Sequence, residues 1–223
     1  MAFINEARRE ISCKLVYCGP GLSGKTTNIV QLYRSARPDH RGRLISLYSE
    51  LERTLYFDFL PIDVGRIRGM NVRFHLYSVP GQVFHAPTRR LVLRGADGIV
   101  FVADSQRSRR DANLEALRDL REHLDYYGVD IAKLPYALQL NKRDLPDICD
   151  LDEMIAELRL CGEPVFQAIA AENLGVRETW REVAKQVLLQ LEADWARGDG
   201  GENLAVVEWL DGTVRPGQVT LDS

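Results

Sequence analysis

The sequence predicts an α/β fold of three layers, built around a mostly parallel six-stranded sheet that contains one antiparallel pair. Short apolar, β-branched segments alternate with helical segments from residue 11 to about residue 196, which is typical of βαβ units. Two of these segments, residues 98–103 and 136–140, are almost continuously apolar, as strands covered on both faces should be. With 45% hydrophobic and 27% charged residues, the composition is that of an ordinary globular protein.

Six segments are expected to form the sheet: Lys14–Cys18, Leu55–Leu60, Val72–Val79, Gly98–Ala103, Tyr136–Leu140 and Val165–Ile169. The second and third are separated only by residues 61–71, which contain glycines and no helical pattern. We therefore expect these two strands to pair antiparallel. Leucines in residues 114–124 and apolar residues in 180–191 recur at helical spacing, and they predict two helices that pack on the sheet.

One domain, residues 1–196, is expected to hold the whole fold, because domains typically contain about 100 to 200 residues. From Arg197 the composition changes to Arg-Gly-Asp-Gly-Gly, which predicts a linker. For the tail that follows, up to residue 223, a short hairpin and disorder are both open alternatives.

The charge balance and the apolar patterning exclude some classes of function. The chain has 29 Lys and Arg against 32 Asp and Glu, so it lacks the basic excess typical of proteins that bind nucleic acid. The first residues form no apolar signal segment, and no stretch approaches the ~18 apolar residues of a membrane span. We expect a cytoplasmic protein without an integral membrane segment and without a nucleic-acid partner.

Residues 19–26, Gly-Pro-Gly-Leu-Ser-Gly-Lys-Thr, match the phosphate-binding pattern G-x-x-x-x-G-K-[ST] between a predicted strand and a predicted helix. Glycines let backbone N–H groups curl around a phosphate, and the helix N-terminus adds the positive end of its dipole. Lys25 is expected to reach the β- and γ-phosphates, and the Thr26 hydroxyl is expected to bind Mg²⁺. The fold expected is thus that of P-loop nucleotide-binding proteins. Its expected nucleotide-binding residues here are Gly19, Gly21, Leu22, Ser23, Gly24, Lys25, Thr26 and Thr27.

A second motif, Asn141-Lys142-Arg143-Asp144, follows a predicted strand and matches the N-K-x-D pattern. An ionised Asp144 can accept hydrogen bonds from N1–H and the 2-amino group of guanine, whereas adenine offers neither donor. Asn141, Lys142 and Asp144 are therefore expected to bind the base, and GTP and GDP are the expected ligands.

Two further segments are expected to contact the γ-phosphate. Residues 78–82, Ser-Val-Pro-Gly-Gln, end a predicted strand, where Gly81 can offer its N–H and Gln82 can orient a water molecule. Thr54 precedes an apolar strand and is expected to complete the Mg²⁺ coordination, with Arg53 beside the same phosphate. Alone, each is an ordinary surface residue, but their order relative to the two motifs favours a function.

From these motifs outward, residues 1–196 resemble the mutual gliding (MglA-type) branch of bacterial small Ras-like GTPases. The resemblance is carried by strings that include residues 53–61, 79–84, 101–106 and 141–146. It implies a GTP-dependent molecular switch in cell polarity or gliding motility, with polar localisation. Arg53 would be an intrinsic arginine finger, and Gln82 would position the attacking water. The resemblance also implies GTP-state effectors and, as GTPase-activating partner, a roadblock-domain homodimer.

Two positions depart from the pattern of Ras-like proteins. Ser78 stands where most of them have Asp, so the hold on Mg²⁺ must be weaker or differently built. The usual S-A-K base loop is represented only by Ile169-Ala170-Ala171, where the backbone N–H of Ala170 is expected to reach guanine O6.

Two other functions stay open on the sequence. One is a GTP-binding scaffold with negligible turnover, which Gln82 and Arg53 argue against. The other is an ATP-using P-loop enzyme such as a nucleotide kinase. Asp144 argues against a kinase, whereas Arg107, Arg109 and Arg110 keep open an arginine-rich lid in residues 107–110.

Overall fold

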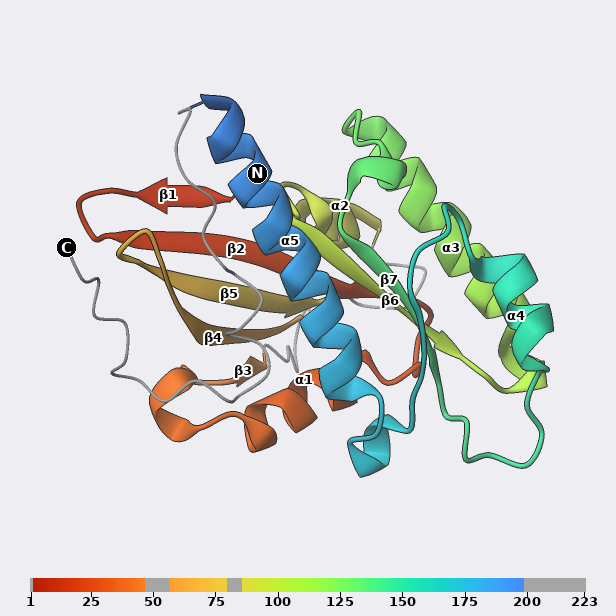
Figure 1. Cartoon of the computed structure of the whole chain (residues 1–223). Coiled ribbons are helices and arrows are strands. Elements are labelled where there is room, and N and C mark those ends of the chain that lie inside the picture. The colour runs from red at the N-terminus through yellow and green to blue at the C-terminus, as the bar shows by residue number, and fades with distance from the viewer. Residues whose placement is uncertain (1, 47–56, 80–85, 199–223) are drawn as a thin grey trace.

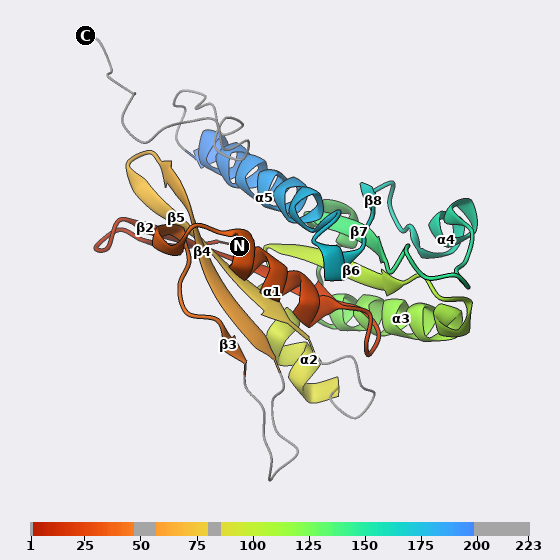
Figure 2. The same cartoon turned by 90° about the horizontal axis from the view of Figure 1, so that it is seen from below.

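The structure is a computed structural model that describes residues 2–46, 57–79 and 86–198. A sheet lies between two layers of helices, with α1 and α5 on one face and α2, α3 and α4 on the other (Figures 1 and 2). The elements, in chain order, are β1 Phe3–Asn5, β2 Glu10–Cys18, α1 Lys25–Ser35, β3 Ile45–Ser46, β4 Asp58–Ile67, β5 Met70–Ser78, α2 Ala86–Leu93, β6 Gly98–Asp104, α3 Arg110–Tyr126, β7 Tyr136–Asn141, α4 Leu151–Leu158, β8 Val165–Gln167 and α5 Val176–Gly198.

The strand order is β3-β4-β5-β2-β6-β7-β8, and β1 also pairs with β2. Strands β5, β2, β6, β7 and β8 run parallel to one another, and β4 is antiparallel to β5. The predicted fold class is confirmed. The count of six strands is corrected to eight in the described residues, because β1 and β3 add short antiparallel pairs. With three and two residues they are too short to show a period in the sequence.

The hairpin of β4 and β5 is tighter than the sequence suggested. Residues 61–67, predicted as part of a connection, continue β4, and only Arg68 and Gly69 form the turn, both with positive φ. Pro61 is tolerated because its carbonyl faces away from β5 and accepts the N–H of Gly42. Since the N and O of one strand residue point to the same side, the missing donor costs no bond to β5.

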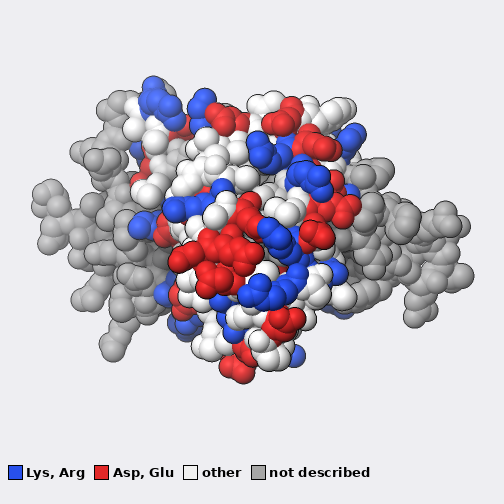
Figure 3. All heavy atoms as spheres, turned by 90° about the vertical axis from the view of Figure 1, so that its right-hand side faces the viewer, with Lys and Arg blue, Asp and Glu red and all other residues white. Residues whose placement is uncertain are grey.

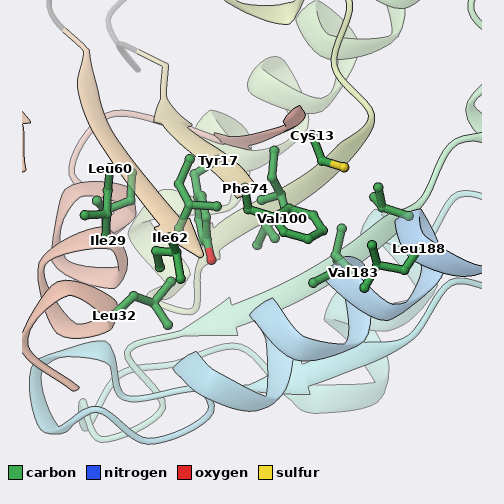
Figure 4. Close-up of a cluster of buried hydrophobic side chains, with 14 of the residues drawn as sticks. Cys13, Tyr17, Ile29, Leu32, Leu60, Ile62, Phe74, Val100, Val183 and Leu188 are labelled. Carbon is green, nitrogen blue, oxygen red and sulfur yellow. The ribbon is translucent and has the colours of Figure 1, made fainter. Parts of the chain in front are cut away.

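Two apolar clusters hold the helices to the sheet. Every residue of β6 and β7 is buried, as expected for strands covered on both faces. Figure 4 shows the cluster between the sheet and helices α1 and α5, where Ile29 lies beside Leu60, Leu32 lies beside Ile62, and Val183 lies near Phe74. The other cluster joins the sheet to Leu117, Leu120 and Leu124 of α3 and to residues of α2 and α4. Both helices predicted from apolar spacing are confirmed.

Helix α5 runs through Gly198, two residues into the predicted linker. Residues 199–223, with the open question of a hairpin, lie outside the described residues. Among the helices that the structure describes, none has the length and apolar character needed to cross a membrane.

Candidate nucleotide-binding site

The P-loop follows β2, at the edge where the parallel strands end and where antiparallel β4 begins. Its backbone has positive φ at Gly19 (131°), Leu22 (66°) and Gly24 (101°). A Cβ on Gly19 would lie 2.2 Å from the carbonyl oxygen of Val102, and one on Gly24 would lie 2.3 Å from Nδ2 of Asn141. Both positions therefore require glycine, for backbone conformation and for space.

Helix α1 begins without a side-chain cap. Gly24 occupies the N-cap position, no side chain accepts a hydrogen bond from the first turn, and that turn has no acidic residue. In α4, by contrast, the Asp150 carboxylate accepts the N–H groups of Asp152 and Glu153. The first N–H groups of α1 are thus left for an anion, as a phosphate site needs.

Lys25 is buried at the start of α1, and its Nζ donates to the carbonyl oxygens of Gly19 (3.0 Å) and Pro20 (2.6 Å). Burial is the main cause that lowers the pKa of Lys25 to about 8, and the nearby cations Arg89 and Arg109 act in the same direction. Phosphate oxygens would favour the charged ammonium and raise this pKa. Binding of a nucleotide should therefore be coupled to protonation of Lys25.

We expect affinity for GDP to fall by about fourfold between pH 7 and pH 8.5, because Lys25 with a pKa of about 8 must take up a proton to bind. The effect is absent well below pH 8 and grows above it. Calorimetric titrations in two buffers of different ionisation enthalpy should show little proton uptake at pH 7 and most of a proton at pH 8.5. Constant affinity without proton uptake would contradict the lowered pKa.

A buried carboxylate, Asp58, gathers hydroxyl groups from three elements at the same edge. Its Oδ2 accepts hydrogen bonds from Thr26 Oγ1 (2.6 Å) and Ser78 Oγ (2.7 Å), and its Oδ1 accepts one from Ser46 Oγ (2.8 Å). The N–H of Asp58 in turn donates to Ser78 Oγ at 2.9 Å. Asp58 thus supplies, from the neighbouring strand, the carboxylate that position 78 lacks.

This arrangement fits Mg²⁺. Because the Thr26 proton points to Asp58, the lone pairs of the Thr26 oxygen stay available for a cation, and hydroxyl and carboxylate oxygens are the hard ligands that Mg²⁺ prefers. The sequence interpretation missed Asp58. The sequence signal that could have identified it is a charged residue within an apolar strand segment. That strand was expected to run antiparallel, so its start lies beside the end of β5.

Replacing Asp58 with Asn should raise the Mg²⁺ concentration needed to slow GDP release by about 10- to 100-fold, as loss of an outer partner of a metal ligand typically does. The amide keeps the size of the side chain but removes its charge. GDP dissociation is measured across a Mg²⁺ titration. The control is Asp63→Asn, on the same strand, where the carboxylate pairs with Arg73. An unchanged Mg²⁺ requirement in Asp58→Asn would remove this residue from the metal site.

Asn141 joins the P-loop to the base loop. Its Nδ2 donates to the carbonyl oxygen of Ser23 at 2.7 Å, and its Oδ1 accepts the N–H of Ala170 at 2.9 Å, both in buried positions. The N–H of Ala170, which was expected to reach guanine O6, is therefore already hydrogen-bonded within the protein.

The two other base-box residues differ in exposure. Lys142 has a φ of 65°, and its Nζ donates to Oδ2 of Asp104 at 2.6 Å. Asp104 is fully buried at the end of β6 and was not singled out from the sequence. Asp144 is exposed, so its carboxylate is open to a ligand.

Some predicted site residues lie outside the described residues, namely Arg53, Thr54, Gly81 and Gln82. Of the predicted P-loop residues, Thr26 is exposed, Thr27 is half-buried and the Ser23 side chain is fully buried.

The three arginines that kept a kinase lid open as an alternative, Arg107, Arg109 and Arg110, lie in the turn before α3 and at the start of α3. Two of them pair with acidic residues of the α4 region, so this segment packs against the domain.

A phosphate loop tied to an N-K-x-D box at the edge of such a sheet places the chain among the small GTP-binding proteins of the P-loop fold. No family model matches the chain. Over 192 residues it is 52% identical to the mutual gliding-motility protein MglA of Myxococcus xanthus (strain DK1622), a match that covers 86% of this chain and 98% of that relative. The chain belongs to the MglA family of small Ras-like GTPases, as the sequence resemblance indicated. It is a nucleotide-dependent switch protein.

Proposed function

We propose that the protein binds GDP and GTP with Mg²⁺, hydrolyses GTP, and acts in the cytoplasm, at a cell pole, in bacterial polarity or gliding motility. The observation that carries this proposal is the clamp of Asn141, whose two hydrogen bonds hold the phosphate loop and the base loop together. A guanine held by Asp144 would then direct its phosphates to the uncapped start of α1. The role in motility is suggested by the name of the related MglA.

Mg²⁺, when bound, neutralises negative charge on the phosphates. Thr26 would bind it through its hydroxyl oxygen, and Asp58 would hold that hydroxyl in place through the 2.6 Å hydrogen bond. Thr54 is proposed as the second hydroxyl ligand, from its position in the sequence. Lys25 would release the carbonyl oxygens of Gly19 and Pro20 and turn to the phosphates.

Hydrolysis is assigned to two residues from their place in the sequence. Gln82 is proposed to orient the attacking water, and Arg53 is proposed to stabilise the charge of the transition state. Gly81 would offer its N–H to the γ-phosphate.

Single-turnover hydrolysis of GTP by purified protein tests this proposal against a scaffold without turnover. We expect slow release of phosphate from the protein alone, and slower release from Gln82→Leu with GTP binding retained. If GTP stays intact while the protein remains bound to it, the scaffold alternative is the correct one.

The proposal extends to the partner, a roadblock-domain homodimer that should accelerate hydrolysis without contributing an arginine. Arg53 lies in the same chain, shortly before β4, and a one-residue slip of such a strand would move every side chain to the other face. A partner that prefers a shifted state would populate it by its differential affinity.

To test the partner, every interface arginine of the activating homodimer is replaced and GTP turnover is measured. Stimulation should persist at nearly its original level. Loss of stimulation with binding retained would show that the partner supplies the arginine.

A further inference from the structure

Arg109 lies beside the P-loop, on a turn that several hydrogen bonds tie to β6. It ends the short turn Arg107–Arg109 that leads into α3. The turn is fixed to β6, because the N–H of Gln106 donates to the Asp104 carboxylate and the amide of Asn113 bonds both backbone groups of Asp104. The N–H of Arg109 itself donates to the carbonyl of Gln106 at 2.9 Å.

From this turn the guanidinium of Arg109 reaches across to the P-loop. Its Nη2 donates to the carbonyl oxygen of Gly21 at 2.8 Å, and its Nε lies 3.9 Å from Oδ2 of Asp104. The same carboxylate oxygen accepts Lys142 of the base box at 2.6 Å. Asp104, which is fully buried, thus lies within ion-pair distance of one cation that touches the phosphate loop and accepts a hydrogen bond from one that belongs to the base box.

The bond to Gly21 sets the direction of the next N–H. In a planar trans peptide the C=O and the following N–H point in opposite directions. Because Arg109 draws the carbonyl of Gly21 towards itself, the N–H of Leu22 points away from Arg109. Lys25, which the P-loop pattern directs to the β- and γ-phosphates, bonds the carbonyls of Gly19 and Pro20, which immediately precede Gly21. We therefore expect this half of the loop to face the phosphates beyond the first.

We propose that Arg109 is a positioning residue for the nucleotide: by holding the Gly21 carbonyl, it turns the Leu22 N–H towards the distal phosphates. Asp104 links this action to the base box through Lys142. The inference rests on the proposed binding of guanine nucleotides. It predicts that Arg109 contributes to the affinity for GDP and not to that for GMP, which lacks the distal phosphates.

Arg110 provides a matched control. It is the next residue and has the same charge, but its guanidinium pairs with Glu157 of α4. On the face that includes α3 and α4, basic and acidic side chains are interspersed (Figure 3). Arg110 and Glu157 form one such pair of opposite charges, from α3 and α4. A general effect of lost positive charge would appear in Arg110→Ala as well.

The test is displacement of a fluorescent GDP by GDP and by GMP at fixed Mg²⁺ and salt. Arg109→Ala should weaken GDP binding by about 10- to 100-fold, the usual effect of losing a hydrogen bond from a charged donor, with GMP binding nearly unchanged. Arg109→Lys should recover the greater part of the loss. Arg110→Ala should match the unmodified protein for both ligands.

Equal weakening of GDP and GMP in Arg109→Ala would show a general structural role and overturn the proposal, and so would no change in either. If Arg109→Ala does not fold, Arg109→Gln, which keeps most of the side-chain volume without the charge, is measured instead with the same outcomes. Failure of the unmodified protein to bind GDP would refute the proposed function, whereas normal GDP binding with an unaffected Arg109→Ala refutes this inference alone.

Discussion

Replacing Arg53 with Ala is expected to slow partner-stimulated hydrolysis of GTP by about 10³- to 10⁵-fold, the range typical of an arginine finger. GTP affinity should stay nearly unchanged, because the group acts on charge that develops only in the transition state. Single-turnover phosphate release and nucleotide displacement, measured on the same preparation, separate the two effects.

The control for Arg53→Ala is Arg43→Ala, which removes an exposed cation from the segment before β3. Its stimulated turnover should equal that of the unmodified protein. Gln82→Leu should reproduce the Arg53 pattern, with slower hydrolysis and retained binding. Unchanged stimulated turnover in Arg53→Ala would exclude Arg53 from the mechanism.

Asp144→Asn is expected to reverse the base preference from guanine to xanthine. The ionised carboxylate accepts two hydrogen bonds from guanine, whereas an amide can donate to the C2 carbonyl of xanthine. In the unmodified protein, guanine nucleotides should bind about 10⁴-fold or more better than adenine nucleotides, since a site built for hydrogen bonds rejects a base that leaves them unmade.

Competition of GTP, XTP and ATP against a fluorescent GDP measures this reversal. Asp147→Asn serves as the control, because Asp147 is an exposed acid three residues further on, beside Arg107. This control should keep the preference for guanine. If ATP displaces GDP from the unmodified protein as well as GTP does, the guanine assignment fails and an ATP-using enzyme becomes the better alternative.

The strands that the sequence predicted well are those whose pattern is local and regular. Residues 98–104 and 136–141 are buried on both faces, and a continuous apolar run is direct evidence of such burial. The far half of β4 was assigned to a connection, since residues 61–71 contain Gly65 and Gly69 and show no helical pattern. In the structure, the nitrogen of Pro61 lies on the side of β4 that faces away from β5, so the proline costs no bond to β5, and an irregular register between Asp63 and Gly65 accommodates the glycine.

The arrangement around Asp58 gives the departure at Ser78 a physical explanation. A carboxylate is still present beside Thr26, but it comes from the start of β4 and is held there by the Ser78 hydroxyl. The hydrogen bond that positions the Thr26 hydroxyl for the proposed Mg²⁺ then depends on the pairing of two neighbouring strands. A slip of β4 by one residue would turn Asp58 to the other face of the sheet and remove it from Thr26.

The sequence by itself determined the P-loop and the base box, because each is a short motif whose chemistry depends on neighbouring residues. Only the tertiary structure decided which distant residues complete them. The bond from Thr26 to Asp58 spans 32 positions, the one from Lys142 to Asp104 spans 38, and the one from Arg109 to Gly21 spans 88. None of these pairs has a characteristic spacing. They meet because parallel β2, β6 and β7 end, and antiparallel β4 begins, at the same edge of the sheet.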